Sequence, residues 1–448
     1  MTELRRGDPT LRKILPPQKT DPAGIYVRSQ FAVPCAHRGK QTWFHMLTRQ
    51  MVQCEQPIPE RATGEEILRV PEWSELAGGY FFAPEGKDEN AFYLGLYRIL
   101  HAMHRKKGVK GYTILPTTVC NARCVYCFEE GRRQETMKPE TAEQVVRYIR
   151  ETRRPEEIDI QWFGGEPLVA VPVIDAICAG LRKEKIPFAA MMVTNGSLIT
   201  DAVADRMRDE WNIRTVQVSM DGNEADYTAR KRYVRGGAVY RDVLRNIRRL
   251  AEREIRVIVR CNVDEENLPG IREFLGDLDA AVPDKRSVDV HLSLLNQVRA
   301  SDREAEVWKQ AAEARQLVKE YGFAAGDRWS RLRDLRNFFC MADLGSVVLT
   351  PDGSVYACES CTEESRVGSL VSAAENPGAR ERFLQAGQVP ERCRGCAFLP
   401  ECTANTFCPI RDARCREVQE ILFGERVKAF FENRDRENGE PDPFEREC

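Results

Sequence analysis

The sequence lacks any hydrophobic run that approaches the ~20 residues needed to cross a bilayer. Its first residues, MTELRRGDPTLRK, also lack the apolar segment of a secretory signal peptide. A strong charge of either sign is missing too, because the formal net charge of −2 offers no general attraction to nucleic acid. We therefore expect a cytoplasmic protein that has neither a membrane nor a nucleic acid as its partner.

Internal repeats and low-complexity tracts are likewise absent. The hydrophobic content of 42% and the charged content of 30% are ordinary for a globular protein. At roughly 100–200 residues per domain, a chain of 448 residues is expected to form two to four domains.

Cysteine, in contrast, is abundant, with 16 residues. Disulfides are rare in a reducing cytoplasm, so metal binding is the stronger expectation. One group is Cys120, Cys124 and Cys127, and a second comprises Cys340, Cys358, Cys361, Cys393, Cys396, Cys402, Cys408 and Cys415. The remaining five, which we interpret as structural or incidental, are Cys35, Cys54, Cys178, Cys261 and Cys448.

The N-terminal quarter divides into two parts. Residues 1–23 combine prolines with many charges and show no clear period, so we expect a flexible leader. Residues 24–105 contain short strand-like runs, a helical stretch near Gly64–Leu68 and a return strand in GYFFAPEG. This pattern predicts a small α+β domain.

From residue 106 to about residue 300, apolar runs alternate with amphipathic helical stretches, which is typical of parallel βα units. The six predicted strands are YTILPTT, IDIQWF, FAAMMV, TVQVSM, IRVIVRCN and VDVHLSLL. The fold class is therefore α/β, with a sheet that curves into a partial (β/α)6 barrel. Residues 301–335 predict a helical bridge, and residues 336–448 a cysteine-rich domain that ends in a helix near residues 414–431.

The first cysteine group lies in TTVCNARCVYCFEE, directly after a predicted strand. A 4Fe–4S cluster is commonly held by four thiolates, so Cys120, Cys124 and Cys127 would leave one iron open to another ligand. An open iron indicates catalysis. The alternative is a zinc site completed by a distant residue, although structural zinc sites usually contain paired CxxC elements.

The spacing of this loop resembles the CxxxCxφC motif of the radical S-adenosylmethionine (SAM) superfamily, with Tyr126 at the aromatic position. The resemblance implies a 4Fe–4S cluster whose open iron chelates the amino and carboxylate groups of SAM. It further implies reductive cleavage of SAM to methionine and a 5′-deoxyadenosyl radical, which abstracts hydrogen from the substrate.

Later strands end in motifs similar to those of the same superfamily, namely GGEP, TNG and SMDG. The resemblance implies that these segments receive the ammonium, ribose or carboxylate of SAM. The implied cofactor-binding residues are Gly164, Gly165, Glu166, Thr194, Asn195, Ser219 and Arg260. Tight turns are the alternative for the first two motifs, Asp221 is expected to shape a turn, and Arg230 or Arg232 would serve as well as Arg260.

The C-terminal cysteines resemble those of a SPASM domain, through CMADLGSVVLTPDGSVYAC and then CRGCAFLPEC. That resemblance implies two auxiliary 4Fe–4S clusters, hence three clusters in all. The implied ligands are Cys340, Cys358 and Cys408 for the first, and Cys393, Cys396, Cys402 and Cys415 for the second. Cys361 is a candidate fourth ligand of the first cluster, and an open iron on that cluster is the alternative. Five residues separate Cys402 from the next cysteine, Cys408, where the family usually has three. Which cluster each later cysteine binds therefore stays open. A pair of zinc knuckles is the alternative.

Glu359 directly follows Cys358, at the place where sulfatase-maturing relatives carry an acidic catalytic base. The resemblance therefore implies a catalytic role for Glu359, although the relatives have aspartate there. A solvated surface carboxylate is the alternative.

SPASM enzymes that modify ribosomal peptides often carry a winged-helix-like domain before the barrel, and residues 24–105 have a suitable size. Such a domain would bind the leader of a precursor peptide by adding a strand to its sheet. A purely structural extension is the alternative.

The resemblance as a whole implies a peptide maturase that forms a thioether or carbon–carbon crosslink and draws electrons from a low-potential reductant such as flavodoxin or ferredoxin. A formylglycine-forming sulfatase-type maturase is one alternative, and a non-catalytic zinc-binding adaptor is another. The peptide, the bond formed and the oligomeric state stay open.

Overall fold

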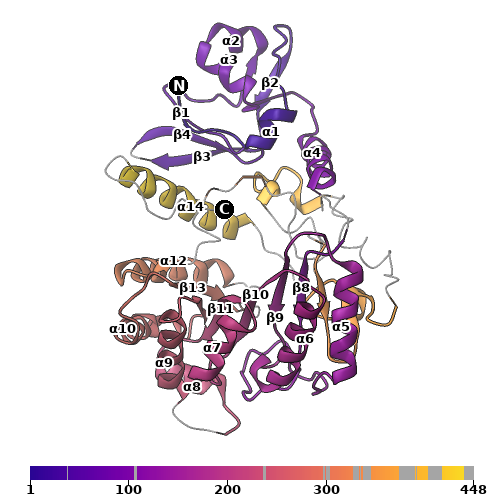
Figure 1. Cartoon of the computed structure of the whole chain (residues 1–448). Helices are drawn as coiled ribbons and strands as arrows, with labels where there is room; N and C mark the ends of the chain where they lie inside the picture. The colour runs from indigo at the N-terminus through magenta and orange to yellow at the C-terminus, as the bar shows by residue number, and fades with distance from the viewer. Residues whose placement is uncertain are drawn as a thin grey trace.

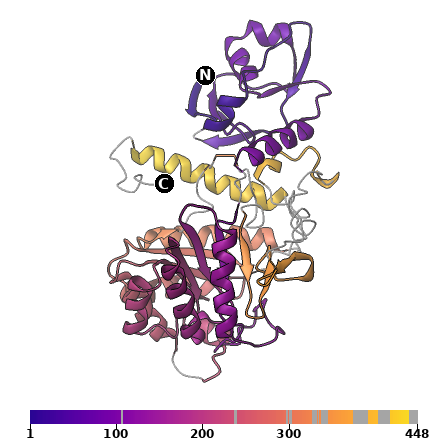
Figure 2. The same cartoon turned by 45° about the vertical axis from the view of Figure 1, so that its right-hand side comes forward.

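The computed structural model describes residues 1–37, 39–104, 108–235, 239–295, 298, 303–325, 332, 334–335, 345–372, 389, 391–401 and 416–437. An N-terminal α+β unit and a central α/β unit lie on opposite sides of a long C-terminal helix, α14 (Arg416–Glu437) (Figures 1 and 2). None of the described helices is both long and apolar enough to cross a membrane.

The central unit is built on an open sheet. Across the described residues its strand order is β14-β13-β12-β11-β10-β9-β8-β15-β16-β17. Neighbouring strands from β14 to β15 are parallel, which confirms the predicted α/β fold with a barrel that does not close. The parallel strands are β8 (Gly111–Ile114), β9 (Ile158–Trp162), β10 (Phe188–Thr194), β11 (Ile213–Met220), β12 (Arg256–Val263), β13 (Val288–Leu294), β14 (Ala324–Ala325) and β15 (Val347–Leu349).

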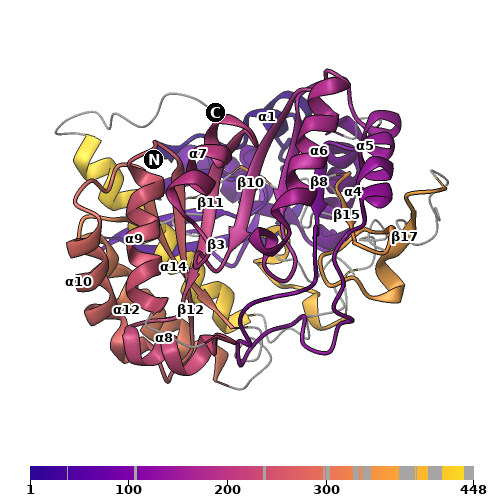
Figure 3. The same ribbon diagram turned by 60° about the horizontal axis from the view of Figure 1, so that its bottom comes forward.

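Helices cover one face of this sheet and leave the other for the site (Figure 3). In β10, for example, Phe188, Ala190 and Met192 are buried, whereas the alternate residues are only partly buried. The helices are α5 (Pro139–Thr152), α6 (Val171–Lys183), α7 (Asp201–Asp209), α8 (Glu224–Lys231), α9 (Val239–Ala251), α10 (Ile271–Ala281) and α12 (Glu304–Glu320). The partly buried residues of the strands therefore line the concave face.

The cysteine-rich region joins the same sheet, which the sequence did not predict. Strand β15 pairs with β8, and the antiparallel strands β16 (Ser354–Tyr356) and β17 (Arg366–Ser369) follow it. Cys358 lies two residues after β16, and Cys120 lies beyond the end of β8. The sheet thus joins the segment that carries Cys358 and Cys361 to the domain that carries Cys120, Cys124 and Cys127.

The N-terminal unit confirms the predicted α+β pattern. One antiparallel sheet has the order β1-β5-β4-β3, and a second has the order β6-β2-β7. The strands are β1 (Thr2–Arg5), β2 (Ile25–Arg28), β3 (Ala32–His37), β4 (Lys40–His45), β5 (Met51–Cys54), β6 (Arg61–Thr63) and β7 (Phe82–Pro84). The helices are α2 (Gly64–Arg69), α3 (Pro71–Gly78) and α4 (Glu89–His104).

The prediction of a flexible leader over residues 1–23 is wrong. Strand β1 pairs with β5, and helix α1 (Pro9–Ile14) begins at Asp8, whose side chain accepts hydrogen bonds from the Thr10 and Leu11 backbone N–H groups at 2.8 Å. Leu11 is buried. An acidic N-cap followed by proline is a helix-start signal that outweighs the high charge of this segment.

Helix α14 joins the N-terminal unit to the rest of the chain. Its Phe423 contacts Phe44 of β4, with ring centroids 5.5 Å apart, and both side chains belong to one buried cluster that also contains Leu399. On its other side, α14 packs against α12 and forms the ion pair Glu432–Lys319 at 3.0 Å. The helix therefore packs between two units instead of covering the cysteine-rich region alone.

Candidate active site and cysteine centres

The loop that carries Cys120, Cys124 and Cys127 leaves the carboxyl end of β8, the edge at which parallel α/β sheets place their active sites. All three cysteines are free thiols, and Cys127 is exposed. Burial raises the pKa of Cys120 to about 11. A bound metal would therefore be needed to hold that sulfur as a thiolate at neutral pH.

Residues 230–234, which we name the strap, hold this loop in place. The Arg123 backbone N–H donates to the Lys231 carbonyl at 3.1 Å, and the Val234 N–H donates to the Asn121 carbonyl at 2.9 Å. An isolated antiparallel bridge joins the two segments. The strap begins in the last turn of α8, so the barrel fixes the backbone of the cysteine loop through a short two-stranded ladder.

A buried polar network lies beneath the loop. The Lys231 ammonium donates to the Tyr126 hydroxyl at 2.9 Å and to the Ser219 hydroxyl at 3.1 Å, and its Nζ lies 3.4 Å from an Asp221 oxygen. Tyr126 also donates to Asp221, which accepts a further bond from Asn262 at 3.1 Å. Asp221 is fully buried, so it does more than shape a turn.

Lys231 and Asn262 were not predicted as site residues. Burial opposes the charge of Lys231, but the neighbouring Asp221 carboxylate prevails and raises the pKa of Lys231 well above its ordinary value. The ammonium is therefore charged and stands close to Cys124. No local motif marks either residue, because each acts through partners far away in the sequence.

The two glycines of GGEP lie against the backbone of the cysteine loop, and their predicted approach to the cofactor stays a prediction. A Cβ on Gly164 would lie 2.4 Å from the Thr117 carbonyl oxygen, and a Cβ on Gly165 would lie 2.4 Å from that of Val119. Those carbonyls belong to the segment that leads into Cys120. The glycines are thus required by the approach of the cysteine loop.

The side chains of Glu166, Thr194 and Asn195 also have protein partners. The buried Glu166 carboxylate accepts bonds from the Thr194 hydroxyl at 2.7 Å and the Asn195 backbone N–H at 2.8 Å. The Asn195 side-chain amide in turn donates to Asn121 in the cysteine loop at 2.8 Å. These residues tie successive strand ends together and to the loop. Their direct contact with SAM stays a prediction.

Of the three candidate arginines, two have other roles. Arg230 forms a two-pronged ion pair with Asp264, with N–O distances of 3.0 and 2.7 Å. Arg232 is exposed just beyond α8, where its φ of 48° ends the helix. Neither guanidinium is available inside the site.

Arg260 is the remaining candidate, and its contact with SAM stays a prediction. It lies on the concave face of β12 and donates to the side-chain oxygens of Asn262 and Ser293, each at 3.1 Å. Within the described ranges it forms no ion pair with a carboxylate. Ser219 pairs with Arg260 in the register of β11 and β12, so a hydroxyl and a guanidinium face the same space.

Glu359 reaches the concave face from the C-terminal region. Its carboxylate accepts a hydrogen bond from Gln161 of β9 at 2.7 Å, and it is close enough to Arg260 to favour the charge of that guanidinium. Arg132 of the cysteine loop donates to the Glu359 and Ser360 carbonyls at 3.2 and 2.8 Å. The partly buried Glu359 is therefore not a solvated surface carboxylate.

Three CxxC segments share one turn geometry. In each, the backbone N–H of the second cysteine donates to the carbonyl of the first, in Cys124–Cys127 (3.1 Å), Cys358–Cys361 (3.0 Å) and Cys393–Cys396 (3.1 Å). The Ser360 hydroxyl also lies 3.1 Å from the Cys358 sulfur. Hydrogen bonds to sulfur are one means by which proteins adjust cluster potentials.

The remaining predicted ligands, Cys340, Cys402, Cys408 and Cys415, lie outside the described residues. Among the residues that are described, no group of three or more histidine, cysteine or acidic side chains is close enough to hold a single metal ion. The auxiliary ligand sets therefore stay predictions.

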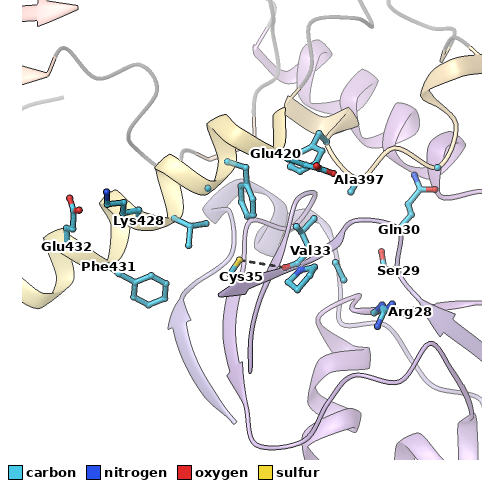
Figure 4. A pocket seen from close by; sticks show the side chains of 17 residues that line it. Arg28, Ser29, Gln30, Val33, Cys35, Ala397, Glu420, Lys428, Phe431 and Glu432 are labelled. Carbon is cyan, nitrogen blue, oxygen red and sulfur yellow. Dashed lines mark hydrogen bonds between the residues drawn. The ribbon is translucent and has the colours of Figure 1, made fainter. Parts of the chain in front are cut away.

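A second candidate site is a cavity of about 860 Å³ between β3 and α14, which we name the β3–α14 groove (Figure 4). Its apolar walls include Val33 of β3 and Phe423 and Phe431 of α14, and residues 395–398 close one side. The strand β3 is the outermost strand of its sheet. An edge strand beside an apolar helix face has the form of a peptide-binding groove.

Comparison with known proteins identifies the central domain. Residues 114–278 match the family model of the radical SAM superfamily. A 172-residue stretch is 28% identical to the uncharacterized protein MJ0907 of Methanocaldococcus jannaschii, covering 38% of this chain and 58% of that one. A serine-type anaerobic sulfatase-maturating enzyme of Klebsiella aerogenes is 24% identical over 315 residues, or 65% of this chain and 77% of the relative.

Two solved structures share the fold at low sequence identity. The anSMEcpe structure with bound AdoMet and the Kp18Cys peptide has a TM-score of 0.59 and 15% identity, and the match covers 73% of this chain and 99% of that one. Streptococcus suis SuiB bound to its precursor peptide SuiA has a TM-score of 0.50 and 12% identity, covering 86% and 96%. Both matches extend beyond the central domain.

Proposed function

The central domain of this chain belongs to the radical SAM superfamily, and on that premise we propose that the chain cleaves SAM reductively and crosslinks a ribosomally synthesised precursor peptide. The observation that carries the proposal is the fixed cysteine loop at the carboxyl end of the sheet, with Ser219 and Arg260 directed at the same space. The product would contain a thioether or a carbon–carbon bond. A reducing cytoplasm would keep the cysteines available for metal.

Cys120, Cys124 and Cys127 would hold the radical SAM cluster. When bound, this cluster supplies the electron that cleaves SAM to methionine and the 5′-deoxyadenosyl radical. The backbone of Gly164 and Gly165 would face the SAM ammonium. The buried network around Lys231 would keep the loop in one conformation while SAM binds.

Ser219 and Arg260 would bind the carboxylate of SAM. Arg260 suits this role because its described hydrogen bonds go to the neutral side-chain oxygens of Asn262 and Ser293. A charge-assisted bond of this kind typically contributes about 1.5–3 kcal/mol. Ser219 is oriented by Lys231, so the hydroxyl is positioned before SAM arrives.

Two auxiliary 4Fe–4S clusters would occupy the C-terminal region. The turn geometry shared by the three CxxC segments supports this assignment. The proposed ligands are Cys340, Cys358, Cys361 and Cys408 for the first cluster, and Cys393, Cys396, Cys402 and Cys415 for the second.

Glu359 would act as the catalytic base. Its carboxylate lies at the concave face, held by Gln161, where it would accept the proton that the substrate loses on oxidation. The two residues come from different parts of the chain, so the base is brought into place only when the C-terminal region docks on the barrel.

The β3–α14 groove would bind the leader of the precursor. An extended peptide would pair with the outer edge of β3 and place alternate side chains against Phe423 and Phe431. The charges along the groove are mixed, with Arg28 and Lys428 opposed by Glu420 and Glu432. Peptides bound in the anSMEcpe and SuiB structures support a peptide as the class of substrate.

Formylglycine formation is the second candidate, favoured by the sulfatase-maturating relative and by the position of Glu359. Both reactions would use the same radical SAM site. They differ in the product, because formylglycine carries an aldehyde and a crosslinked peptide does not.

The test is mass spectrometry of precursor peptides encoded beside this chain after anaerobic incubation with the reconstituted enzyme, SAM and dithionite. We expect a loss of two hydrogens per crosslink without reactivity toward a hydrazide probe. Aldehyde formation would support the sulfatase-type reaction instead. Zinc in place of iron, with no peptide change, would support the non-catalytic adaptor and refute the proposal.

A further inference from the structure

The outer surface of the cysteine loop is exposed and basic. The bridge between Ala122 and Tyr233 sets the register of loop and strap, so Arg123 lies opposite Arg232 on the outward side. Val125 and Val234 are 47% and 62% exposed on the same surface. We name as the arginine face Arg123, Val125, Arg232 and Val234 together with the exposed Arg235, which directly follows Val234 in the chain.

The three arginines of this face have no acidic partner within the part of the chain that the structure describes. Elsewhere exposed arginines are commonly paired, as Arg214 is with Glu157 and Arg248 with Glu252. Like charges opposite one another across a ladder are destabilising. Their presence here therefore calls for a compensating role.

The arginine face is also the covering of the cysteine site. Cys124 stands between Arg123 and Val125 in the sequence but faces inward, toward the buried Lys231. A partner seated on this face would be separated from a cluster on Cys124 by the thickness of one loop. Glu130 is exposed farther along, beyond Cys127, so the basic surface is centred on the strap side.

We propose that the arginine face is the docking site of an acidic one-electron carrier protein of the flavodoxin or ferredoxin type. This docking site rests on the function proposed above. The carrier gives up one electron, the cluster on Cys120, Cys124 and Cys127 accepts it, and no proton is transferred. Electrons thus enter at the radical SAM site directly and do not pass through the C-terminal cysteines.

The chemistry of the surface suits a transient redox partner. Exposed valines provide a small apolar centre, and the arginines around it attract an acidic protein. Complementary charge of this kind raises association rates by about 10- to 1,000-fold and makes them sensitive to salt. Association with the carrier should therefore weaken steeply as ionic strength rises.

The test compares the full reconstituted chain with the variant Arg232→Glu/Arg235→Glu. Arg232 bonds to the cysteine loop through its backbone carbonyl, so both substitutions change side chains outside the bonds that hold the loop. The iron content of each preparation is measured first. Two readouts follow: the dissociation constant for oxidised flavodoxin, and the rate of 5′-deoxyadenosine formation driven either by flavodoxin with its reductase or by dithionite.

We expect the variant to bind flavodoxin about 10-fold more weakly at low salt. The flavodoxin-driven rate should fall by a similar factor, while the dithionite-driven rate stays within about twofold of wild type. The control Arg245→Glu/Arg286→Glu makes the same change in net charge on exposed residues of the helical side, 68% and 83% exposed, and should leave both readouts unchanged.

Unaltered flavodoxin binding in the first variant would overturn the docking site, as would an equal loss in the control. If Arg232→Glu/Arg235→Glu loses iron, the milder pair Arg232→Gln/Arg235→Gln is measured in its place. A wild-type chain that forms no 5′-deoxyadenosine with dithionite would refute the proposed function, whereas the binding measurement still decides the docking surface.

Discussion

The central cysteine loop and the C-terminal cysteines are held in different ways. The central loop is bonded on one side to the strap and on the other to the GGEP turn, and Lys231 fills the space beneath it. Cys358 and Cys361 instead follow a short hairpin, and Arg132 donates to the carbonyls of the two residues between them. The first site is thus built within one domain, and the second depends on contacts between domains.

The Cys393–Cys396 turn extends this contrast, because its surroundings come from both ends of the chain. Glu401, the last described residue of that segment, forms buried ion pairs with Arg49 of the N-terminal unit and Arg426 of α14. Nearby Phe398 contacts Phe423 with ring centroids 5.8 Å apart. We therefore expect the central site to keep its cluster when a substitution disturbs the auxiliary region.

The largest effect is expected from removing the central ligands. The variant Cys120→Ala/Cys124→Ala/Cys127→Ala should form no detectable 5′-deoxyadenosine, because no thiolate is left to hold the radical SAM cluster. Since the auxiliary sites use other cysteines, about 8 of roughly 12 irons should remain, if each cluster holds four irons. Iron analysis measures the remaining iron, and chromatography measures the 5′-deoxyadenosine formed. Retained cleavage of SAM would refute the site assignment.

The next largest effect is expected where the Cys393–Cys396 segment meets the N-terminal unit and α14, a contact that we name the junction. Glu401→Gln leaves Arg49 and Arg426 buried without their carboxylate, which typically costs about 3–5 kcal/mol. We expect a lower melting temperature and loss of the second auxiliary cluster, with the central cluster retained. Calorimetry and iron analysis measure these effects.

The matched control is Glu432→Gln, which removes an exposed ion pair with Lys319. Its effect on stability should be within about 0.5 kcal/mol. Equal losses of stability in Glu401→Gln and Glu432→Gln would mean that the buried ion pairs of Glu401 contribute no more than an exposed pair.

A smaller change is expected for Arg260→Met. Losing one charge-assisted bond to the SAM carboxylate should weaken SAM binding by about 10- to 100-fold while the iron content stays constant. Equilibrium binding of SAM to the reconstituted protein gives the dissociation constant. Arg230→Met serves as the comparison, because it disrupts the ion pair with Asp264 and should lower stability more than SAM affinity.

The smallest effect is expected for Arg132→Gln. Loss of its hydrogen bonds to the Glu359 and Ser360 carbonyls should destabilise the Cys358–Cys361 turn by about 1 kcal/mol. A chelator should then remove iron from the first auxiliary cluster faster than from wild type, and from the central cluster at the same rate. Arg133→Gln provides the control, and identical kinetics in both variants would count against this role of Arg132.

Much of the central domain could be predicted because its signals are local. The apolar runs that became β8 to β13 alternate with helical stretches, and the spacing of Cys120, Cys124 and Cys127 is read within a single loop. The role of Glu166 could not be predicted in this way, because its partners Thr194 and Asn195 lie on the next strand end.

Other features depend on contacts between distant segments. The pairing of β15 with β8 joins the cysteine-rich region to the barrel across more than half of the chain, and no periodic pattern announces it. At the N-terminus, prolines and charge favour an unstructured segment, but the Asp8 carboxylate caps α1 and also accepts the Leu335 backbone N–H at 2.8 Å. That second bond fixes a segment which the composition alone presents as unstructured.

The measurement that tests the account most directly is the electron paramagnetic resonance spectrum of the reduced, reconstituted full chain with and without SAM, followed by assay of 5′-deoxyadenosine. We predict that the signal from one cluster changes when SAM is added, that the change is missing in the Cys120→Ala/Cys124→Ala/Cys127→Ala variant, and that 5′-deoxyadenosine accumulates only with the wild-type chain. A spectrum indifferent to SAM, with zinc in place of iron and no 5′-deoxyadenosine, would contradict the central claim.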